Sequence, residues 1–333
     1  MPDFMSLKKW RQTILENKKI IAIGEALIDF IPDKTGCAFN DVTAFSPKVG
    51  GAPANVCGAF SRLGGRSMMI TQLGNDPFGK KIADELAAYG IDTSAIRFTD
   101  EANTSLAFVS LEKDGNRTFS FYRKPSADML LSPEQIEEKW FDDAYALHFC
   151  SVSLGDFPMK DAHIRAIDIA KNKGMLISFD PNLRFPLWND REKLRSRVNE
   201  FIPMCDILKV SDEELEFITG ESDIGKAAPK LFEKGVKLIV YTCGKNGAYA
   251  YTKNAAAYSP SEKVKTVDTT GAGDGFIGSF LWKLSILGID AENIATIDES
   301  TLRECLDFSN KFCSVSVQSE GAIASYPTID QLK

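Results

Sequence analysis

The sequence predicts an α/β protein in which helices cover both faces of a mainly parallel β-sheet and a second, smaller β-sheet stands beside it. From residue 19 onward, short runs rich in Ile, Val and Leu alternate with longer amphipathic segments, as in parallel strands joined by helices. Several amphipathic segments end at a glycine, which readily adopts the left-handed conformation found at helix ends. Residues 38–49 and 104–123 instead alternate like exposed antiparallel strands.

Each element follows from these patterns in chain order. The strands expected in the main sheet are the apolar runs at 20–31, 67–72, 145–151, 175–180, 207–210 and 238–242. The helices expected between them lie at 54–63, 78–89, 164–173, 191–201, 212–219 and 225–234. A hairpin over 247–259 should follow, and then a long helix that begins near residue 271. Residues 1–19 lack the apolar core of a secretion signal and favour a short helix or a frayed end.

The two alternating stretches favour a small sheet that stands off the main domain as a lid. Lys113-Asp114-Gly115-Asn116 is a favourable hairpin turn between two β-rich arms. If the stretches pair, residues of about 32–49 and 104–124 form the lid, and the rest of residues 1–333 forms one α/β domain. The alternative is that both are edge strands of the main sheet.

The composition favours a soluble cytoplasmic protein that does not bind nucleic acid. The formal net charge is −7 and there is no long basic cluster to bind a phosphate backbone. The chain also lacks a run of about eighteen apolar residues, which a membrane span would require. Its seven cysteines include no CxxC pair and are expected to be reduced. An anionic ligand would therefore be held by backbone amides and helix N-termini.

The strongest candidate site is the run Asp268-Thr269-Thr270-Gly271-Ala272-Gly273-Asp274-Gly275. Small residues allow several N–H groups to converge at a helix N-terminus, where a phosphoryl group could be stabilised. Asp274 falls in the first turn of the helix, where a carboxylate could accept the proton of a hydroxyl that attacks a phosphate. An acidic first turn also stabilises a helix by itself, so the run alone fits a plain capped helix as well.

Two motifs together resemble the signatures of a known family. Residues 268–281, D-T-T-G-A-G-D-G-F-I-G-S-F-L, resemble the C-terminal signature of the PfkB carbohydrate kinases, and residues 50–56, G-G-A-P-A-N-V, resemble the N-terminal one. The sequence between them is compatible over about residues 20–328. The resemblance implies a three-layer ribokinase-like fold with a small β-sheet lid. It also implies ATP-dependent phosphorylation of a sugar primary hydroxyl.

The resemblance assigns the sugar and phosphoryl-transfer residues. It makes Asp274 the catalytic base and Gly271, Ala272 and Gly273 the anion hole. Asp29 matches a family carboxylate that grips sugar hydroxyls, a task that suits a carboxylate because it accepts well-directed hydrogen bonds. The other sugar-binding residues that it implies are Gly50, Gly51, Asn55, Arg123 and Arg184.

The nucleotide site is assigned in the same way. Residues 242–247, T-C-G-K-N-G, resemble the family's T-x-G-x-x-G loop, which implies ATP contacts from Thr242, Gly244 and Gly247. Asn310 falls on the late helix that borders the adenine. Lys209 either reaches the phosphates or is an exposed lysine at a strand end. Without the family, the loop fits a plain strand and turn.

The metal ligands that the resemblance implies are fewer. Glu214 matches the glutamate of an N-x-x-E motif and is expected to bind Mg²⁺ through water, although Ser211 stands where the family has asparagine. Asp268 and Thr270 match positions at which some relatives bind a monovalent cation. K⁺ is therefore a candidate cofactor beside ATP and Mg²⁺.

Three stretches resemble those of the family members that act on fructose: 24–32, 119–131 and 179–184. The resemblance implies fructose as the substrate and fructose 6-phosphate as the product. Kinases for 2-keto-3-deoxygluconate carry similar arginines for a carboxylate, which suits the arginine fork. They often also have a tyrosine two residues before the lid arginine, where this chain has Phe121. Another PfkB sugar kinase, or a regulator that binds sugar or nucleotide without turnover, remains an alternative. Related kinases often pair their lid sheets, which implies a homodimer.

Overall fold

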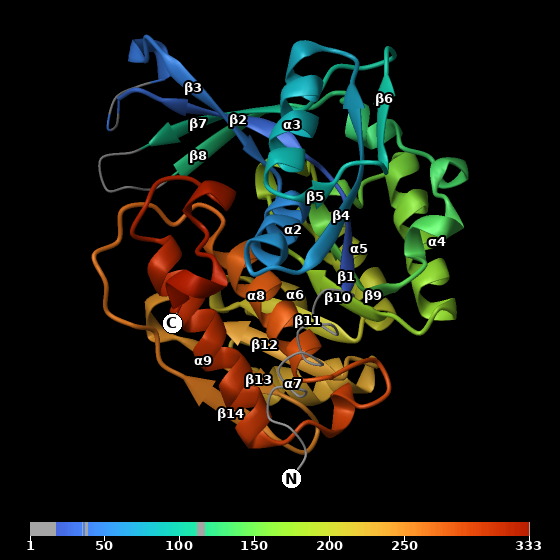
Figure 1. The fold of residues 1–333 in the computed structure, drawn as a ribbon, viewed down its shortest axis with the longest axis vertical. Helices are drawn as coiled ribbons and strands as arrows, with labels where there is room; N and C mark the ends of the chain where they lie inside the picture. Colours follow the sequence, from blue (N-terminus) through green and yellow to red (C-terminus); the bar gives the residue numbers. More distant parts are fainter. Residues whose placement is uncertain (1–17, 35, 37–38, 112–116, 333) are drawn as a thin grey trace.

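A large, mainly parallel sheet forms the centre of the computed structural model (Figure 1). The structure describes residues 18–332 except 35, 37–38 and 112–116. In these residues the sheet has ten strands in the order β14-β13-β12-β11-β10-β9-β1-β4-β5, with β6 paired to β4. The strands are β1 (Lys19–Ile23), β4 (Arg66–Gly74), β5 (Ile91–Asp92), β6 (Ile96–Thr99), β9 (Ala144–Cys150), β10 (Leu176–Asp180), β11 (Ile207–Ser211), β12 (Leu238–Thr242), β13 (Ala248–Tyr251) and β14 (Ala256–Ser259). Among the described residues, two pairings of this sheet are antiparallel, β12 with β13 and β13 with β14, and the others are parallel.

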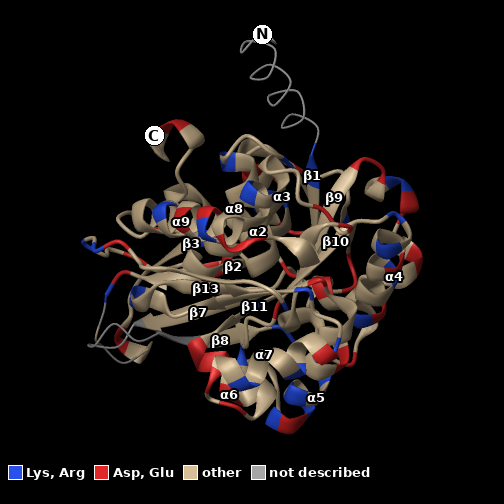
Figure 2. Ribbon diagram, turned by 90° about the horizontal axis from the view of Figure 1, so that it is seen from below, with Lys and Arg blue, Asp and Glu red and all other residues tan. Residues whose placement is uncertain are grey.

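Helices cover both faces of this sheet, and each face has its own hydrophobic core. One face carries α2 (Ala52–Arg62), α3 (Pro77–Ala88), α8 (Ala272–Ile286) and α9 (Glu299–Ser316). The other carries α4 (Pro158–Asn172), α5 (Arg191–Phe201), α6 (Asp212–Thr219) and α7 (Ile224–Glu233). Figure 2 shows basic and acidic residues interspersed along α4 and α5. In the described parts of the chain, every helix is too short or too polar to cross a lipid bilayer.

A second sheet of four strands stands off the main sheet at the upper left of Figure 1. Its order among the described residues is β3-β2-β7-β8, from β2 (Leu27–Pro32), β3 (Phe45–Gly50), β7 (Leu106–Leu111) and β8 (Arg117–Tyr122). The pairing of β2 with β7 is parallel and the other two are antiparallel. The two alternating stretches therefore lie in this small sheet and not in the main one, but they do not pair with each other, because β2 lies between β3 and β7. The small sheet thus includes residues 27–31, which the expected lid of about 32–49 and 104–124 leaves out. The predicted turn at 113–116 and residues 1–17 lie outside the described residues.

The prediction of one strand over 20–31 is wrong, because this segment forms two strands in different sheets. β1 lies between β4 and β9 in the main sheet, whereas β2 lies between β3 and β7 in the small one. The chain leaves the main sheet at Gly24, whose N–H still donates to the carbonyl of Ile70 at 3.2 Å. Apolar runs flank the break closely on both sides, with only Gly24, Glu25 and Ala26 between the strands, so the pattern does not reveal the change of sheet. The short link places Glu25 between the two sheets.

The other predicted strands and helices are confirmed, with ends that differ by at most a few residues except at β3, which begins at Phe45 instead of 38, and at α4. This helix begins at Pro158, six residues before the predicted start at 164, because proline is well suited to the first turn of a helix. β5 and β6 were not predicted, since segments of two and four residues are too short to show a period.

Candidate active site

Two cavities meet at the N-terminus of α8. The first, which we term the lid cavity, has a volume of about 520 Å³ and lies between the small sheet and the main domain. The second, which we term the loop cavity, has a volume of about 580 Å³ and lies beside the loop that follows β12. Thr269, just before α8, lines both cavities. The first turn of α8 is thus the wall that the two cavities share.

The loop before α8 is held in place from both sides. Gly271 adopts a left-handed conformation with φ of 71°, as its glycine-rich sequence allows. The Tyr326 hydroxyl donates to the Gly271 carbonyl at 2.6 Å and fills the space that a side chain there would occupy. The Asp268 carboxylate accepts hydrogen bonds from the Thr270 N–H at 2.9 Å and from the Gly321 N–H at 2.9 Å. Asp268 and Thr270 therefore lie together against the 321 segment.

Asp274 is a buried carboxylate that lines the lid cavity. The Asn55 side-chain amide donates to one of its oxygens at 2.8 Å, and the Asn182 amide donates to the other at 3.0 Å. Burial raises the pKa of Asp274, whereas the Asn55 amide, Arg184 and Lys209 oppose the rise. The result is a carboxylate with a fixed orientation and a pKa above that of an ordinary aspartate.

Asn182 was not predicted as a site residue. It follows β10 and adopts a left-handed backbone conformation with φ of 44°. The Asp180 carboxylate accepts its N–H at 3.1 Å and closes this turn. Its position, just beyond the carboxyl end of a parallel strand, is a signal that could have found it, because ligands bind at that edge of an open α/β sheet.

The lid cavity gathers most of the predicted sugar-binding residues. Asp29 from β2, Gly51 and Asn55 at the start of α2, and Arg184 all line it. Gly50 packs directly behind the Asp29 carboxylate, where a side chain would collide with it. The Oδ1 atom of Asn55 is buried without a hydrogen-bond partner, so it is available to a hydroxyl donor on a ligand.

Arg123 lies behind the wall of the lid cavity and does not line it. It faces a neighbouring cavity instead and is only 6% exposed. Its guanidinium forms a buried ion pair with Asp128 and donates to the Val152 carbonyl at 3.2 Å. This placement differs from the predicted direct contact with the sugar, because Asp128 already binds the guanidinium.

Glu25 is a further residue of the lid cavity that was not predicted. It is 3% exposed and accepts a hydrogen bond from the Ser153 hydroxyl at 3.2 Å. Burial raises its pKa to about 7, although Arg123 opposes the rise. Glu25 lies four residues before Asp29 in the motif at 24–32, and this motif predicted only Asp29 as a site residue.

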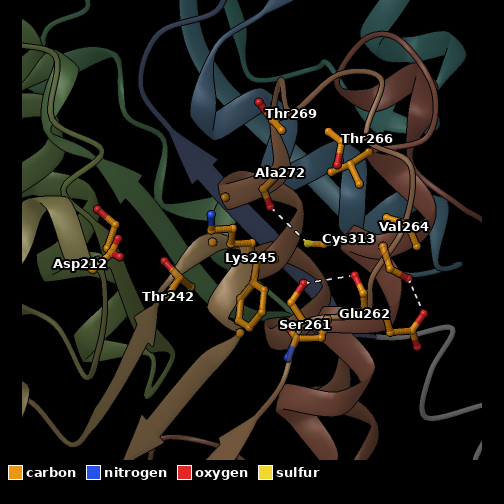
Figure 3. Close-up of a pocket in the computed structure, with 18 of the residues that line it drawn as sticks. Asp212, Thr242, Lys245, Ser261, Glu262, Val264, Thr266, Thr269, Ala272 and Cys313 are labelled. Atoms are coloured by element: carbon orange, nitrogen blue, oxygen red, sulfur yellow. Dashed lines mark hydrogen bonds between the residues drawn. The ribbon is translucent and has the colours of Figure 1, made fainter. Parts of the chain in front are cut away.

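The predicted nucleotide-binding residues lie together around the loop cavity (Figure 3). They are Lys209, Thr242, Gly244, Gly247 and Asn310, and the backbone of Ala272 and Gly273 completes the wall towards α8. The Asn310 amide donates to the Ser259 carbonyl at 3.0 Å, which fixes the chain opposite the 242–247 loop. Figure 3 also shows Cys313, whose thiol donates to the Ala272 carbonyl at 3.3 Å.

Lys209 is buried beside the first turn of α8, so the alternative of an exposed lysine is wrong. Its ammonium lies 3.0 Å from the Asp180 carboxylate and 3.3 Å from the position that a Cβ atom on Gly273 would take. Burial would lower the pKa of Lys209, but Asp180 and Glu214 outweigh burial and raise it. A protonated ammonium therefore stands at the edge of the loop cavity.

Glu214 and Ser211 form a capping box at the start of α6. The two carboxylate oxygens of Glu214 accept N–H groups from Leu183 at 2.8 Å and from Ser211 at 3.0 Å. Ser211 itself lines the loop cavity, but Glu214 does not. Within the described residues, no three His, Cys, Asp or Glu side chains cluster as a metal site. A role for Glu214 in binding Mg²⁺ through water stays a prediction.

Comparisons with known proteins fit this geometry. Residues 17–329 match the family model described as "pfkB family carbohydrate kinase". The chain is 42% identical to fructokinase-2 of Solanum habrochaites over 313 residues, which cover 94% of each chain. A fructokinase structure from Xylella fastidiosa with bound ATP superposes with a TM-score of 0.87 at 32% identity and covers 95% of this chain and 97% of that one.

A second solved structure adds ligands to the comparison. It is a double mutant of a fructokinase from Vibrio cholerae O395 in a form with bound fructose, ADP and potassium ion. Its TM-score is 0.83 at 32% identity, and the match covers 95% of this chain and 97% of that one. The fold class predicted from the sequence is confirmed by these structures.

Proposed function

Because this chain belongs to the pfkB family of carbohydrate kinases, we propose that it transfers the γ-phosphoryl group of ATP to fructose and forms fructose 6-phosphate. One observation carries the proposal: Asp274 faces a cavity lined by carboxylates and amides, and the first turn of α8 separates that cavity from the loop cavity. The matching relatives named fructokinase, and the Vibrio cholerae structure with fructose and ADP, support fructose and ATP as the substrates.

In the proposed reaction, fructose binds in the lid cavity, with hydroxyl groups donated to Asp29 and to Oδ1 of Asn55. Asp274 accepts the proton of the 6-hydroxyl as its oxygen attacks the γ-phosphorus. The bond from this phosphorus to the oxygen of the β-phosphate breaks, and ADP leaves. The N-terminal amides of α8 and the Lys209 ammonium stabilise the charge of the transferring group. The Ala272 N–H already donates to the Thr269 carbonyl at 3.1 Å, so we assign Gly273 and Asp274 as the main backbone donors.

A substitution at Asp274 tests this mechanism. Asp274→Asn should lower kcat by about 10² to 10⁴, the usual contribution of a general base, and leave binding of fructose and ATP within a few-fold by calorimetry. Asp84→Asn on the exposed side of α3 is the matched control and should retain wild-type kcat. Normal turnover by Asp274→Asn would refute the assignment.

A second experiment tests the substrate by comparing product formation from fructose and from 2-keto-3-deoxygluconate at matched concentration. A large preference for the acid would rule out fructose.

We also propose that Mg²⁺ accompanies ATP and that K⁺ binds beside Asp268 and Thr270. The hydrogen bond from the Gly321 N–H to Asp268 supports the second site, because it joins Asp268 to the segment 315–321, whose backbone carbonyl groups we expect to supply the remaining oxygen ligands. A cation there would add positive charge next to the anion hole, and Glu214 would bind Mg²⁺ through water. At fixed ionic strength, K⁺ should therefore raise kcat relative to tetramethylammonium. Equal rates in the two salts would remove the K⁺ proposal.

We propose further that the small sheet acts as a lid and pairs with its counterpart in a homodimer. Its strands cover the lid cavity through Asp29, Val109 and Phe121 on one face. On the opposite face, Phe39 and Tyr122 are 41% and 64% exposed. A closed lid would exclude water from the phosphoryl group and limit hydrolysis of ATP. Dependence on ATP and a free sugar supports action in the cytoplasm.

A further inference from the structure

The charges around the lid cavity are mainly negative. Of the described residues that line it, Glu25, Asp29 and Asp274 carry carboxylates and Arg184 carries a guanidinium. Asp274 has the base role proposed above, and Asp29 matches a family sugar ligand. The mechanism gives no role to Glu25, although it is nearly fully buried. A carboxylate is seldom buried without a partner, because burial removes its hydration.

The second arginine near the cavity is neutralised by a buried partner. The side chains of Arg123 and Asp128 are 4% and 1% exposed, and the Arg123 Nε donates to Asp128 at 3.1 Å. The Ser126 hydroxyl donates to the other oxygen of Asp128 at 2.6 Å. A planar guanidinium held in this way is not free to form a two-point contact with a carboxylate on a ligand.

Ser153 connects this ion pair to Glu25. The Arg123 Nη2 donates to the Ser153 hydroxyl oxygen at 3.2 Å, and the same hydroxyl donates to Glu25 at 3.2 Å. The chain of contacts runs from Asp128 through Arg123 and Ser153 to the cavity wall. The hydrogen bond from Ser153 fixes the position of the Glu25 carboxylate in the cavity wall.

We propose that Glu25, held by Ser153 and the Arg123–Asp128 pair, makes the lid cavity selective for a neutral sugar over a sugar acid. Glu25 accepts a hydrogen bond from a sugar hydroxyl and repels a ligand carboxylate at the same place. This inference rests on the proposed function, because it assigns the lid cavity to the sugar. It names the residues that make the cavity prefer fructose to 2-keto-3-deoxygluconate. The presence of the two arginines does not by itself decide between these two substrates.

The electrostatics of the wall support this assignment. The charged groups that face Glu25 are Arg123, Asp128 and Arg184, and the net result is still a pKa raised by burial to about 7. The nearby arginines therefore do not offset the burial of one negative charge. A carboxylate that the ligand brought to the same place would lose its hydration in the same way and would also lie next to the ionised form of Glu25. A neutral sugar hydroxyl would meet an acceptor.

The test compares kcat/KM for fructose and for 2-keto-3-deoxygluconate in Glu25→Gln, which keeps the shape and removes the charge. The variant should lose about tenfold in kcat/KM for fructose, mainly through KM, because a charge-assisted hydrogen bond becomes a neutral one. Its kcat/KM for the acid should rise, so the preference for fructose should fall more than tenfold. Glu233→Gln on the exposed side of α7 is the control and should keep the wild-type preference.

The pH dependence of this preference gives a second readout. In the wild-type enzyme the ratio of the two kcat/KM values should rise as pH rises through about 7, because Glu25 becomes charged. Titration of the base Asp274 affects both substrates and cancels in the ratio. In Glu25→Gln the ratio should stay flat over this range. A ratio that varies equally in both proteins would overturn the proposal.

The outcomes separate this inference from the proposed function. If the wild-type chain phosphorylates neither compound, the proposed function itself has failed. If it phosphorylates fructose and a folded Glu25→Gln protein keeps the same preference, only the role of Glu25 is wrong. Thermal unfolding checks that the variant is folded. Should it fail to fold, Ser153→Ala, which leaves Glu25 in place but removes its hydroxyl partner, should lower the preference several-fold, and an unchanged preference there would count against the proposal.

Discussion

At the scale of single residues, two amides control the proposed base. Asn55 and Asn182 each donate to a different oxygen of Asp274. These hydrogen bonds stabilise the charged form, whereas burial favours the neutral form. Because each carboxylate oxygen accepts one of these hydrogen bonds, the carboxylate cannot rotate freely, and its remaining lone pairs keep a fixed direction. The amides therefore set both the direction of proton transfer and the pH at which the base is active.

Removal of the Asn182 side chain should reveal this control. Loss of one donor raises the pKa of Asp274 further, so the base is protonated at a higher pH. In Asn182→Gly we expect kcat to fall about tenfold, consistent with one lost hydrogen bond to a charged group. The acid limb of the kcat profile should move to higher pH, and KM for fructose should change little. Steady-state kinetics between pH 5 and 9 would measure both effects.

The choice of glycine separates the side chain from the backbone at this position. Asn182 has φ of 44°, which glycine adopts without strain and alanine does not. Asn182→Ala should therefore lose more stability than Asn182→Gly but show the same shift of the acid limb. If the acid limb of Asn182→Gly stays at the wild-type pH, the amide does not tune the base.

The sequence predicted the residues that carry a motif and missed those that act through distant contacts. Asp29, Asn55, Asp274 and the 242–247 loop each stand in a recognisable pattern, and the structure brings them to the two cavities. Asn182 contacts Asp274 across 92 positions of the chain, and Tyr326 contacts Gly271 across 55. Local spacing does not encode such pairs, because they depend on how the helices and strands pack. Glu25 is a different case, because its raised pKa comes from its burial, which the residue type alone does not reveal.

At the scale of helices and strands, the close packing of α2 on α8 brings Asn55 to Asp274. A Cβ atom on Gly278 would lie 2.7 Å from the Ala59 Cβ and 2.9 Å from the Val56 carbonyl oxygen. Both distances are shorter than side chains tolerate, so only glycine fits at this crossing. The helices therefore approach closely enough for an amide on one to reach a carboxylate on the other.

Gly278→Ala should separate the two helices. In an exposed helix this change would stabilise the protein, because alanine has the higher helix propensity by about 1 kcal/mol. Here we expect the free energy of unfolding to fall by about 1–3 kcal/mol, the usual cost of overpacking. Urea unfolding would measure it, and kcat should fall because the Asn55 hydrogen bond lengthens.

A second substitution controls for this interpretation. Ala59→Gly removes one of the two atoms that the new methyl group would strike. Combined with Gly278→Ala, it should recover part of the lost kcat, although the Val56 carbonyl remains in the way. A Gly278→Ala protein as stable and as active as the wild type would show that the crossing has room to spare.

Elements of the main sheet were predictable where one period ran from end to end. Helices such as α5 and α6 have clear ends, with Asp190 and Gly220 next to their terminal residues. The segment 20–31 was not predicted as two strands, because only Gly24, Glu25 and Ala26 separate the apolar run of β1 from β2, and one charged residue in so short a link does not reveal a change of sheet. An apolar pattern indicates which residues are buried, but it does not indicate in which sheet they lie. β1 is buried throughout and β2 is partly buried, in different sheets.

At the scale of the whole molecule, the outer face of the small sheet is an aromatic surface. Phe30 and Phe108 stack with ring centroids 4.7 Å apart, and Phe45 packs edge-on against Phe108 at 5.3 Å. Phe39 and Tyr122 extend the cluster to the surface. Large exposed aromatic side chains gathered on one sheet are unusual on a monomer and typical of an interface. This surface supports the proposed homodimer, with one small sheet packed on its counterpart.

Charge on this surface should dissociate the proposed dimer. A protein that carries both Phe39→Asp and Tyr122→Asp would place two carboxylates from each subunit in an apolar contact, and burial of unpaired charge costs far more than the contact returns. Sedimentation velocity should show the wild-type chain as a dimer and the double variant as a monomer. Tyr258→Asp is the control, because Tyr258 is 37% exposed on the main sheet, and it should leave the dimer intact.

A wild-type chain that is monomeric at assay concentration would exclude the dimer. In that case the aromatic face would need another role, because the opposite face of the small sheet already lines the lid cavity.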